Sequence, residues 1–218
     1  LGDDVNSAWA LVFLSSHCTG SPGDIEEGFA LNEEALALFR VHDDKAGITR
    51  ALNSLGELAR LDGDYDRARE AYEECFHLCL ETGDRLREAF AVGNLGLVAQ
   101  HQGDSRQAEA YMMKALRLLI DLNTRYVLSL ALTILSGPVA SRGNPERAAQ
   151  LLGASDAILG AMGLELQPAD GAEIDRYKAG IQQQLGDDGF QSAWMKGQSM
   201  SLEQAIAFAL EDGLENGS

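Results

Sequence analysis

The sequence has 218 residues, of which 45% are hydrophobic and 6% aromatic, and 34 acidic against 17 basic residues give a formal net charge of −17 at pH 7. Acidic residues are spread along the chain and no Lys/Arg cluster forms a basic stripe, which disfavours direct nucleic-acid contact. The longest apolar run, Ala8 to Leu14, is too short to cross a bilayer, and no signal segment opens the chain, so a membrane role is disfavoured too. Cys18, Cys75 and Cys79 lie within helical apolar patterns rather than a disulfide framework, which favours the reducing cytoplasm.

The chain repeats itself at a fixed spacing. The stretch Ala51 to Tyr72 returns as Ala91 to Met112, a period of forty. The positions that recur are Leu55/Leu95/Leu135, Gly56/Gly96, Gly63/Gly103/Gly143 and Ala68/Ala108/Ala148. A fixed period of this size indicates stacked supersecondary units that bury their apolar faces against one another.

Two sets of helix boundaries recur in each period. In the first set, a residue that tolerates the left-handed conformation precedes an N-cap residue. The pairs are Asp3-Asp4, Asp43-Asp44, Gly83-Asp84 and Asn123-Thr124. The second set, half a period later, comprises Gly23-Asp24, Gly63-Asp64, Gly103-Asp104 and Gly143-Asn144. Two boundaries per period predict two helices of about 17 residues in each unit.

These boundaries predict four helix-pair repeats, at residues 4–43, 44–83, 84–123 and 124–162. After Gly163 the period fails, and residues 163–212 are expected to form capping helices: Ala169 to Leu185 ended by Gly186, Asp188 to Lys196 ended by Gly197, and Ser201 to Glu211. The side chains expected to cover the apolar end of the stack are Phe190, Trp194, Ile206 and Phe208.

Small residues recur where two helices must approach closely. Gly56 in the first helix and Ala68 in the second keep their type at the same phase, so a bulky side chain there should push the helices apart. One local conflict lies in the fourth repeat, where Pro138 cannot donate a hydrogen bond to residue 134. A kink or an early helix end is expected there.

The repeat resembles the tetratricopeptide repeat (TPR). Leu55-Gly56, Gly63, Ala68 and Tyr72 follow that family's pattern, although the period is forty rather than the usual 34 and no unit has the closing proline. The resemblance implies an all-α, right-handed TPR-like α-solenoid of antiparallel helix pairs, closed by a C-terminal helical cap.

A second resemblance covers the C-terminal region. It rests on the segment from Glu146 to Ala154, then on Gly189-Phe190, Trp194, and finally Ser201 to Ala205. These elements resemble the closing segment of large bacterial LuxR-type, SARP-type or cyclase-linked regulators, in which a STAND-class NTPase precedes a TPR-like array. Leu1 is not a methionine, so the sequence is expected to be a piece of such a longer protein.

No catalytic motif is found, and no cofactor or metal is predicted. A phosphate-binding loop, H-E-x-x-H, G-x-S-x-G and G-x-G-x-x-G do not occur. Cys75 and Cys79 share a helix face from which His77 points away, so buried packing residues are favoured over a metal site. His17 and Cys18 are adjacent and diverge by about 100° on a helix, which excludes a local nucleophile–base pair.

The TPR resemblance implies that the first helix of each repeat lines a concave groove that binds a peptide or partner helix. The candidate groove residues are His17, Arg50, Asn53, Glu57, Arg60, Phe90, Asn94, Leu97, His101, Leu130, Thr133 and Ile134. Arg50, Asn53 and Arg60 could grip a carboxylate. The family's carboxylate clamp, however, spreads such residues over three units, and solvated charge is the alternative.

The sequence thus indicates a non-enzymatic interaction module. Its partner would be a protein or peptide in the groove, or upstream domains of the same chain, in a regulator whose switching the groove biases. A free-standing adaptor or a self-assembling homo-oligomer is the first alternative. An enzyme on a helical-repeat frame is the second.

Overall fold

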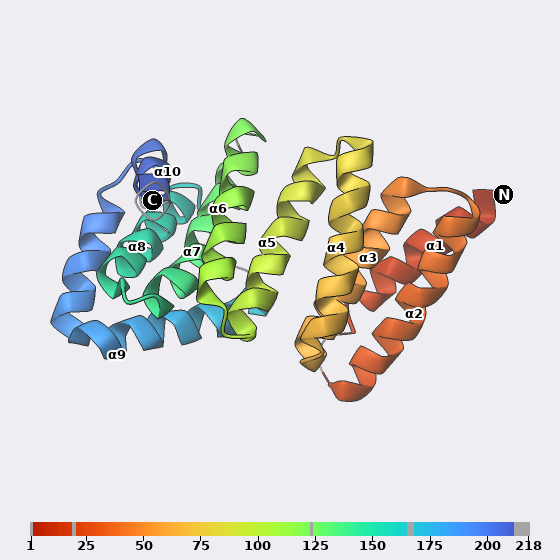
Figure 1. The fold of residues 1–218 in the computed structure, drawn as a ribbon, viewed down its shortest axis with the longest axis horizontal. Coiled ribbons are helices and arrows are strands. Elements are labelled where there is room, and N and C mark those ends of the chain that lie inside the picture. The colour runs from red at the N-terminus through yellow and green to blue at the C-terminus, as the bar shows by residue number, and fades with distance from the viewer. Residues whose placement is uncertain (1, 19–20, 123, 165–167, 212–218) are drawn as a thin grey trace. The chain divides into compact units, whose positions relative to one another are not determined.

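The computed structural model describes residues 2–18, 21–122, 124–164 and 168–211, where every regular element is an α-helix (Figure 1). The helices are α1 (Gly2–Ser15), α2 (Pro22–Val41), α3 (Lys45–Asp62), α4 (Tyr65–Thr82), α5 (Arg85–His101), α6 (Ser105–Leu122), α7 (Arg125–Ser141), α8 (Pro145–Ala161), α9 (Pro168–Gln198) and α10 (Leu202–Glu211). None of the helices in these ranges is both long and apolar enough to span a membrane. The chain divides into two compact units, residues 1–102 and 103–218.

The first unit contains α1 to α5. Each helix packs against the next one in the chain, and α3 also contacts both α1 and α5. This order of contacts is that of stacked antiparallel helix pairs, as the sequence period predicts. Phe39, Leu52 and Cys75 are among the side chains that join α2, α3 and α4 in one apolar core.

The second unit contains α6 to α10. Helices α6, α7, α8 and α9 pack in chain order, while α10 lies against both α7 and α8. Phe190 is buried, as predicted, but Trp194, Ile206 and Phe208 are only partly buried. Ile181, Ala205 and Ala209 are fully buried in their place. The small side chains of Ala205 and Ala209 therefore allow α10 to pack closely against α7 and α8.

The repeated aspartates cap the helices that follow them. The Oδ1 atoms of Asp44, Asp64, Asp84 and Asp104 accept hydrogen bonds from the backbone N–H three residues later, at 2.9–3.1 Å. Such a cap satisfies one of the backbone donors that a helix N-terminus leaves open. The glycines that end the preceding helices have positive φ at Gly63, Gly83, Gly103 and Gly143, and Asp43 has φ 51°. These boundary predictions are confirmed.

The first repeat departs from the prediction. Asp3 and Asp4 lie inside α1, which begins at Gly2, and so they do not separate two helices. Gly23 and Asp24 lie in the first turn of α2, where Ser21 is the N-cap and its Oγ accepts from the N–H of Asp24 at 3.3 Å. Pro22 occupies the first helical position, which its missing N–H suits, and this moves the helix start forward.

The other cap predictions have mixed outcomes. Ser201 and Gln204 form the predicted reciprocal capping box, at 2.8 and 3.2 Å. Thr124 and Asn144 stand at N-cap positions, but their side chains make no cap hydrogen bond. Asn123 lies outside the described residues.

Helix α7 does not end at Pro138. It runs on to Ser141 with the proline inside it, so of the two predicted outcomes, a kink or an early end, the early end is wrong. Gly137, Pro138 and Val139 are all buried, and the ring of Tyr177 lies against Gly137. Burial against α9 therefore holds the helix together although one backbone hydrogen bond is missing.

Helix α9 breaks where Gly186 was predicted to end a helix, because this residue has φ 69° and ψ 167° between two helical halves. Gly197, in contrast, does not end the second half, which continues to Gln198. A Cβ atom at Gly197 would lie 2.0 Å from the carbonyl oxygen of Gln150 in α8. A glycine is required at this position because the backbones of α8 and α9 are in direct contact.

The small residue at Gly56 has the predicted packing role. A Cβ atom there would lie 2.5 Å from the ring of Tyr72, which is fully buried. We expect Gly56→Ala to lower the free energy of unfolding by about 1–3 kcal/mol in a urea titration, despite alanine's better helix propensity. The exposed neighbour Glu57 offers the control, since Glu57→Ala should change stability by less than about 0.5 kcal/mol. Equal effects of the two substitutions would contradict the close approach.

Arg147 connects α10 to α8 through hydrogen bonds. Its guanidinium Nη2 donates to the carbonyl oxygens of Phe208 and Ala209 at 2.8 and 3.0 Å, which are among the open acceptors at the end of α10. We expect Arg147→Met, which keeps the apolar stem, to accelerate amide hydrogen exchange within residues 202–211 at least tenfold while leaving α3 unchanged. Unchanged exchange in α10 would show that its apolar contacts alone hold it.

Candidate functional site

The first unit contains a pocket of about 380 Å³ formed by α1, α3, α4 and α5. Its lining residues are Trp9, Thr49, Arg50, Asn53, Cys75, Asp84, Leu86, Arg87 and Phe90. Most of them come from the first helices of the three successive pairs, the helices that were predicted to line the groove.

The rim of this pocket is apolar and accessible. Trp9, Leu86 and Phe90 are 36–39% exposed although each is a large hydrophobic residue. The Trp9 ring is held edge-on against the buried ring of Phe39, with 5.2 Å between centroids. An apolar surface of this kind, held open on a rigid support, is typical of a binding site.

Two polar features face the same pocket. Arg50 is exposed and has no ion pair within the part of the chain that the structure describes. Asn53 accepts a hydrogen bond at its Oδ1 from the Nδ2 of Asn94, at 2.9 Å, across α3 and α5. The bond holds the Asn53 amide in one orientation and leaves its NH₂ group available as a donor.

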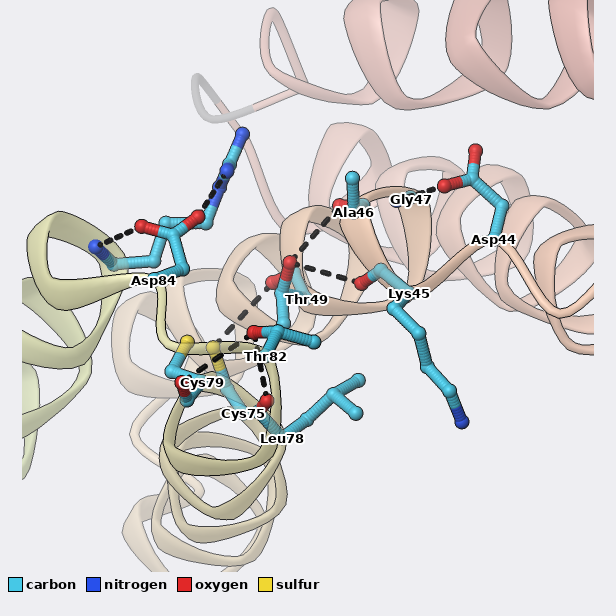
Figure 2. Close-up of polar contacts among 11 residues, drawn as sticks. Asp44, Lys45, Ala46, Gly47, Thr49, Cys75, Leu78, Cys79, Thr82 and Asp84 are labelled. Atoms are coloured by element: carbon cyan, nitrogen blue, oxygen red, sulfur yellow. Dashed lines mark hydrogen bonds and ion pairs between the residues drawn. The ribbon is translucent and has the colours of Figure 1, made fainter.

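The polar groups of Thr49, Cys75 and Asp84, which line the pocket, already have hydrogen-bond partners within the chain (Figure 2). The Cys75 thiol donates to the carbonyl oxygen of Thr49 at 3.4 Å, and a hydrogen bond with Cys79 together with burial raises the pKa of Cys75. Partial burial acts to raise the pKa of Asp84, but hydrogen bonds from the backbone N–H and the guanidinium of Arg87 outweigh it and lower that pKa. Cys75 therefore stays a neutral thiol and Asp84 stays ionised, so the Cys75 side chain is not an activated nucleophile.

The cysteine and histidine placements follow the helical spacing. Cys75 and Cys79 are buried on one face of α4, whereas His77 is exposed. No group of three or more His, Cys, Asp or Glu residues is close enough to hold a metal ion in the described ranges.

The structure brings only some of the candidate groove residues together. Arg50, Asn53 and Phe90 line the pocket, and Asn94 is hydrogen-bonded to it. The remaining candidates of the first unit do not line this pocket. Glu57 is exposed, Arg60 hydrogen-bonds to Tyr72, Leu97 is buried, His101 stacks on the Tyr65 ring at 5.1 Å, and His17 stacks edge-on against Phe13.

The candidates of the second unit belong to another environment. Leu130 and Ile134 are half-buried on α7. Thr133 is buried and its Oγ1 hydrogen-bonds to the Oγ of Ser155 at 2.6 Å. It borders a separate pocket within that unit.

Trp9, Leu86 and Arg87 line the pocket but are not among the residues predicted for the groove. Trp9 stands one full period before Thr49, so the period would have placed both on the same face. Leu86 stands one helical turn before Phe90 on α5. Arg87 also stands within one helical turn of Phe90, so helical spacing from Phe90 predicts both Leu86 and Arg87.

Stacked antiparallel helix pairs with an accessible pocket on their first helices define a helical-repeat interaction protein. The tetratricopeptide repeat family profile matches residues 6–81 and 48–121, which together span more than half of the chain. The chain therefore belongs to the tetratricopeptide repeat family, whose repeats make it a protein-interaction module.

Solved structures support the same fold. The chain is similar to a Podospora anserina protein described as a kinesin light chain with nearly identical TPR-like repeats, with a TM-score of 0.62 and 15% identity over 94% of this chain and 96% of that one. It is also similar to BtubC (BKLC) from P. vanneervenii, with a TM-score of 0.56 and 18% identity over 100% of this chain and 91% of that one. At these identities the likeness concerns the fold alone. No curated protein sequence matches the chain.

Proposed function

We propose that the pocket of the first unit binds an extended peptide segment of a protein partner. The segment would place an apolar side chain between Trp9, Leu86 and Phe90 and a carboxylate against Arg50. The observation that carries this proposal is Arg50, unpaired among the described residues, beside an exposed aromatic rim in a chain whose net charge is −17.

The charge of Arg50 supports a carboxylate group on the bound peptide. Where acidic residues outnumber basic ones two to one, an exposed arginine would be expected to find a partner within its own chain. Other arginines of the first unit do form such ion pairs. Arg40 pairs with Glu74 and Arg67 pairs with Glu33, both at 2.6 Å. Arg50 has no such partner among the described residues, and guanidinium groups bind carboxylates with directed hydrogen bonds.

Size and polarity support a peptide rather than a folded surface. A pocket of about 380 Å³ is at the small end of ligand pockets and holds one or two side chains. The Asn53 amide, oriented by Asn94, can donate to a backbone carbonyl of an extended segment. The apolar rim, the Asn53 amide and the Arg50 guanidinium could therefore contact a side chain, a backbone carbonyl and a carboxylate of consecutive residues in one extended peptide.

Selection from a random peptide library tests this function. Peptides would be selected on the purified chain and counter-selected against the Arg50→Glu, Phe90→Ala double variant. We expect the enriched sequences to share an apolar residue next to an acidic residue or a C-terminal carboxylate. Enrichment of neutral or basic sequences would contradict the proposal.

We further propose that the chain is the cytoplasmic sensor or scaffold arm of a bacterial STAND NTPase regulator. The support is the resemblance between residues 146–205 and the closing segments of such regulators. Residues of that segment meet in one packed body, where α8 contacts both α9 and α10. Peptide binding in the first unit would then bias the nucleotide cycle of the upstream domain.

The parent gene upstream of Leu1 tests this second proposal. A reading frame that encodes a G-x-x-x-x-G-K-[ST] loop and a DNA-binding or cyclase domain is the expected result. A frame that starts near Leu1 would instead identify a free-standing adaptor, and the regulatory role would be withdrawn.

A further inference from the structure

The second unit contains its own pocket, separate from the peptide site. It has a volume of about 460 Å³ and lies among α7, α8 and α9. Its apolar wall is formed by Leu152, Leu159, Leu164, Ile174 and Trp194. The volume is within the range of ligand pockets, and charged side chains share the lining with this apolar wall.

Trp194 is held as a fixed aromatic face. Its ring lies 5.4 Å from the ring of buried Phe190, measured between centroids. The Nζ atom of Lys178 lies 4.9 Å from the centroid of the Trp194 ring. A cation over an indole face is attracted by the ring quadrupole, so the pocket already contains one cation–π contact from its own chain.

Two carboxylates border the same pocket. Asp175 stands three residues before Lys178 on α9, a spacing that allows an ion pair, yet Lys178 lies over Trp194 and the described residues form no ion pair to Asp175. Asp156 accepts a hydrogen bond from Nε2 of Gln198 at 3.1 Å and likewise has no cation in the ranges that the structure covers. Among the described residues that line the pocket, carboxylates therefore outnumber cations.

The hydroxyl groups of the pocket are already satisfied. Thr133 donates to Ser155 at 2.6 Å, and Ser155 donates to the carbonyl oxygen of Ser129 at 2.8 Å. A ligand would therefore be recognised by its charge and its apolar stem rather than by these hydroxyls.

From this geometry we propose that the pocket of the second unit receives a lysine or arginine side chain from a basic segment of a partner protein. The aliphatic stem would pack on Leu152, Leu159 and Ile174, and the cationic head would take the place of Lys178 on Trp194, with Asp175 and Asp156 beside it. Lys178 then acts as an internal competitor that occupies the aromatic face when no partner is bound.

The fluorescence of Trp194 tests this proposal directly. The chain has two tryptophans, so Trp9→Phe leaves Trp194 as the only reporter. The probe is acetyl-Ala-Arg-Ala-amide, and its neutral match has citrulline in place of arginine. We expect a saturable change in Trp194 emission with the arginine peptide and none with the citrulline peptide.

Matched variants separate the pocket from general surface charge. Asp175→Asn should weaken binding at least fivefold, whereas Asp188→Asn, an exposed residue of the same helix outside the pocket lining, should change it less than twofold. Lys178→Met removes the competitor and should tighten binding at least threefold. Circular dichroism and the urea midpoint of each variant confirm that it is folded.

Three outcomes would overturn the proposal. They are an absence of saturable change, an equal loss in the two aspartate variants, and tight binding of spermidine without binding of the arginine peptide, which would indicate a small amine as the ligand. In the Trp9→Phe background, Arg50→Glu should leave the change in Trp194 emission unaltered, because Arg50 lines the pocket of the first unit and Trp194 lines that of the second.

Discussion

Replacing Gly197 with alanine is expected to lower the free energy of unfolding of the second unit by about 3 kcal/mol. The added Cβ atom would lie 2.0 Å from the carbonyl oxygen of Gln150, and backbone atoms inside a helix cannot rotate away as a side chain can. Gly153→Ala should act similarly, because its Cβ atom would lie 2.2 Å from the carbonyl oxygen of Trp194. These two glycines bring the backbones of α8 and α9 into direct contact from both sides.

The same helices provide the control. A Cβ atom at Gly160 in α8 or at Gly180 in α9 meets nothing within 4 Å. Alanine at these positions should stabilise the protein by about 0.5–1 kcal/mol, because it has the higher helix propensity. Urea unfolding followed by far-UV circular dichroism measures all four variants. If Gly197→Ala were as stable as Gly160→Ala, the close approach of α8 and α9 would be wrong.

Arg50→Glu is expected to abolish binding of the acidic peptides that the first unit selects, with a loss of at least fiftyfold in Kd. The substitution removes the cation and also places a like charge against the peptide carboxylate, and like-charge contacts cost several kcal/mol at an interface. Phe90→Ala should weaken the same peptides about tenfold by removing part of the apolar rim. Isothermal titration calorimetry with one selected peptide measures both effects.

Charge reversal makes this result specific. A peptide whose acidic residue is changed to lysine should bind Arg50→Glu better than it binds the unaltered chain. Arg69→Ala is the control, because Arg69 pairs with Asp66 and does not line the pocket. A loss of affinity in Arg69→Ala equal to that in Arg50→Glu would indicate general electrostatics and not a site.

Local signals made the repeat architecture predictable. A left-handed glycine followed by a capping aspartate recurs from one repeat to the next, and each such pair acts within one turn of its own helix. The chemistry of Gly63-Asp64 and Gly103-Asp104 therefore needs no knowledge of distant contacts. The first repeat was misplaced because the period assigned its boundary to Gly23-Asp24, while Ser21-Pro22 is a stronger local start.

Long-range packing explains most of the other differences. Pro138 stays inside α7 because α9 covers this region, and the whole of α8 separates these two helices in the sequence. Gly197 has the composition signal of a helix end, but its role is the contact with Gln150. Neither contact can be inferred from the residues around the glycine or the proline.

Part of the lining of the first-unit pocket was predictable to the level of a helix face. Arg50, Asn53 and Phe90 were placed in the groove because the sequence period aligns the first helices. The rotation of each helix is not fixed by the period, so Leu97 and Arg60 were assigned to the groove although one is buried and the other turns to Tyr72. The second pocket depends on α9, which lies beyond the periodic region.

Site-specific photo-crosslinking tests the central claim, that the pocket of the first unit holds a peptide. Benzoylphenylalanine would replace Phe90 in one sample and Leu61, which is exposed on α3 outside the pocket, in another. A selected acidic peptide is expected to cross-link at position 90 and not at position 61. Cross-linking at position 61 alone, or equally at both positions, would contradict the assignment of this pocket as the peptide site.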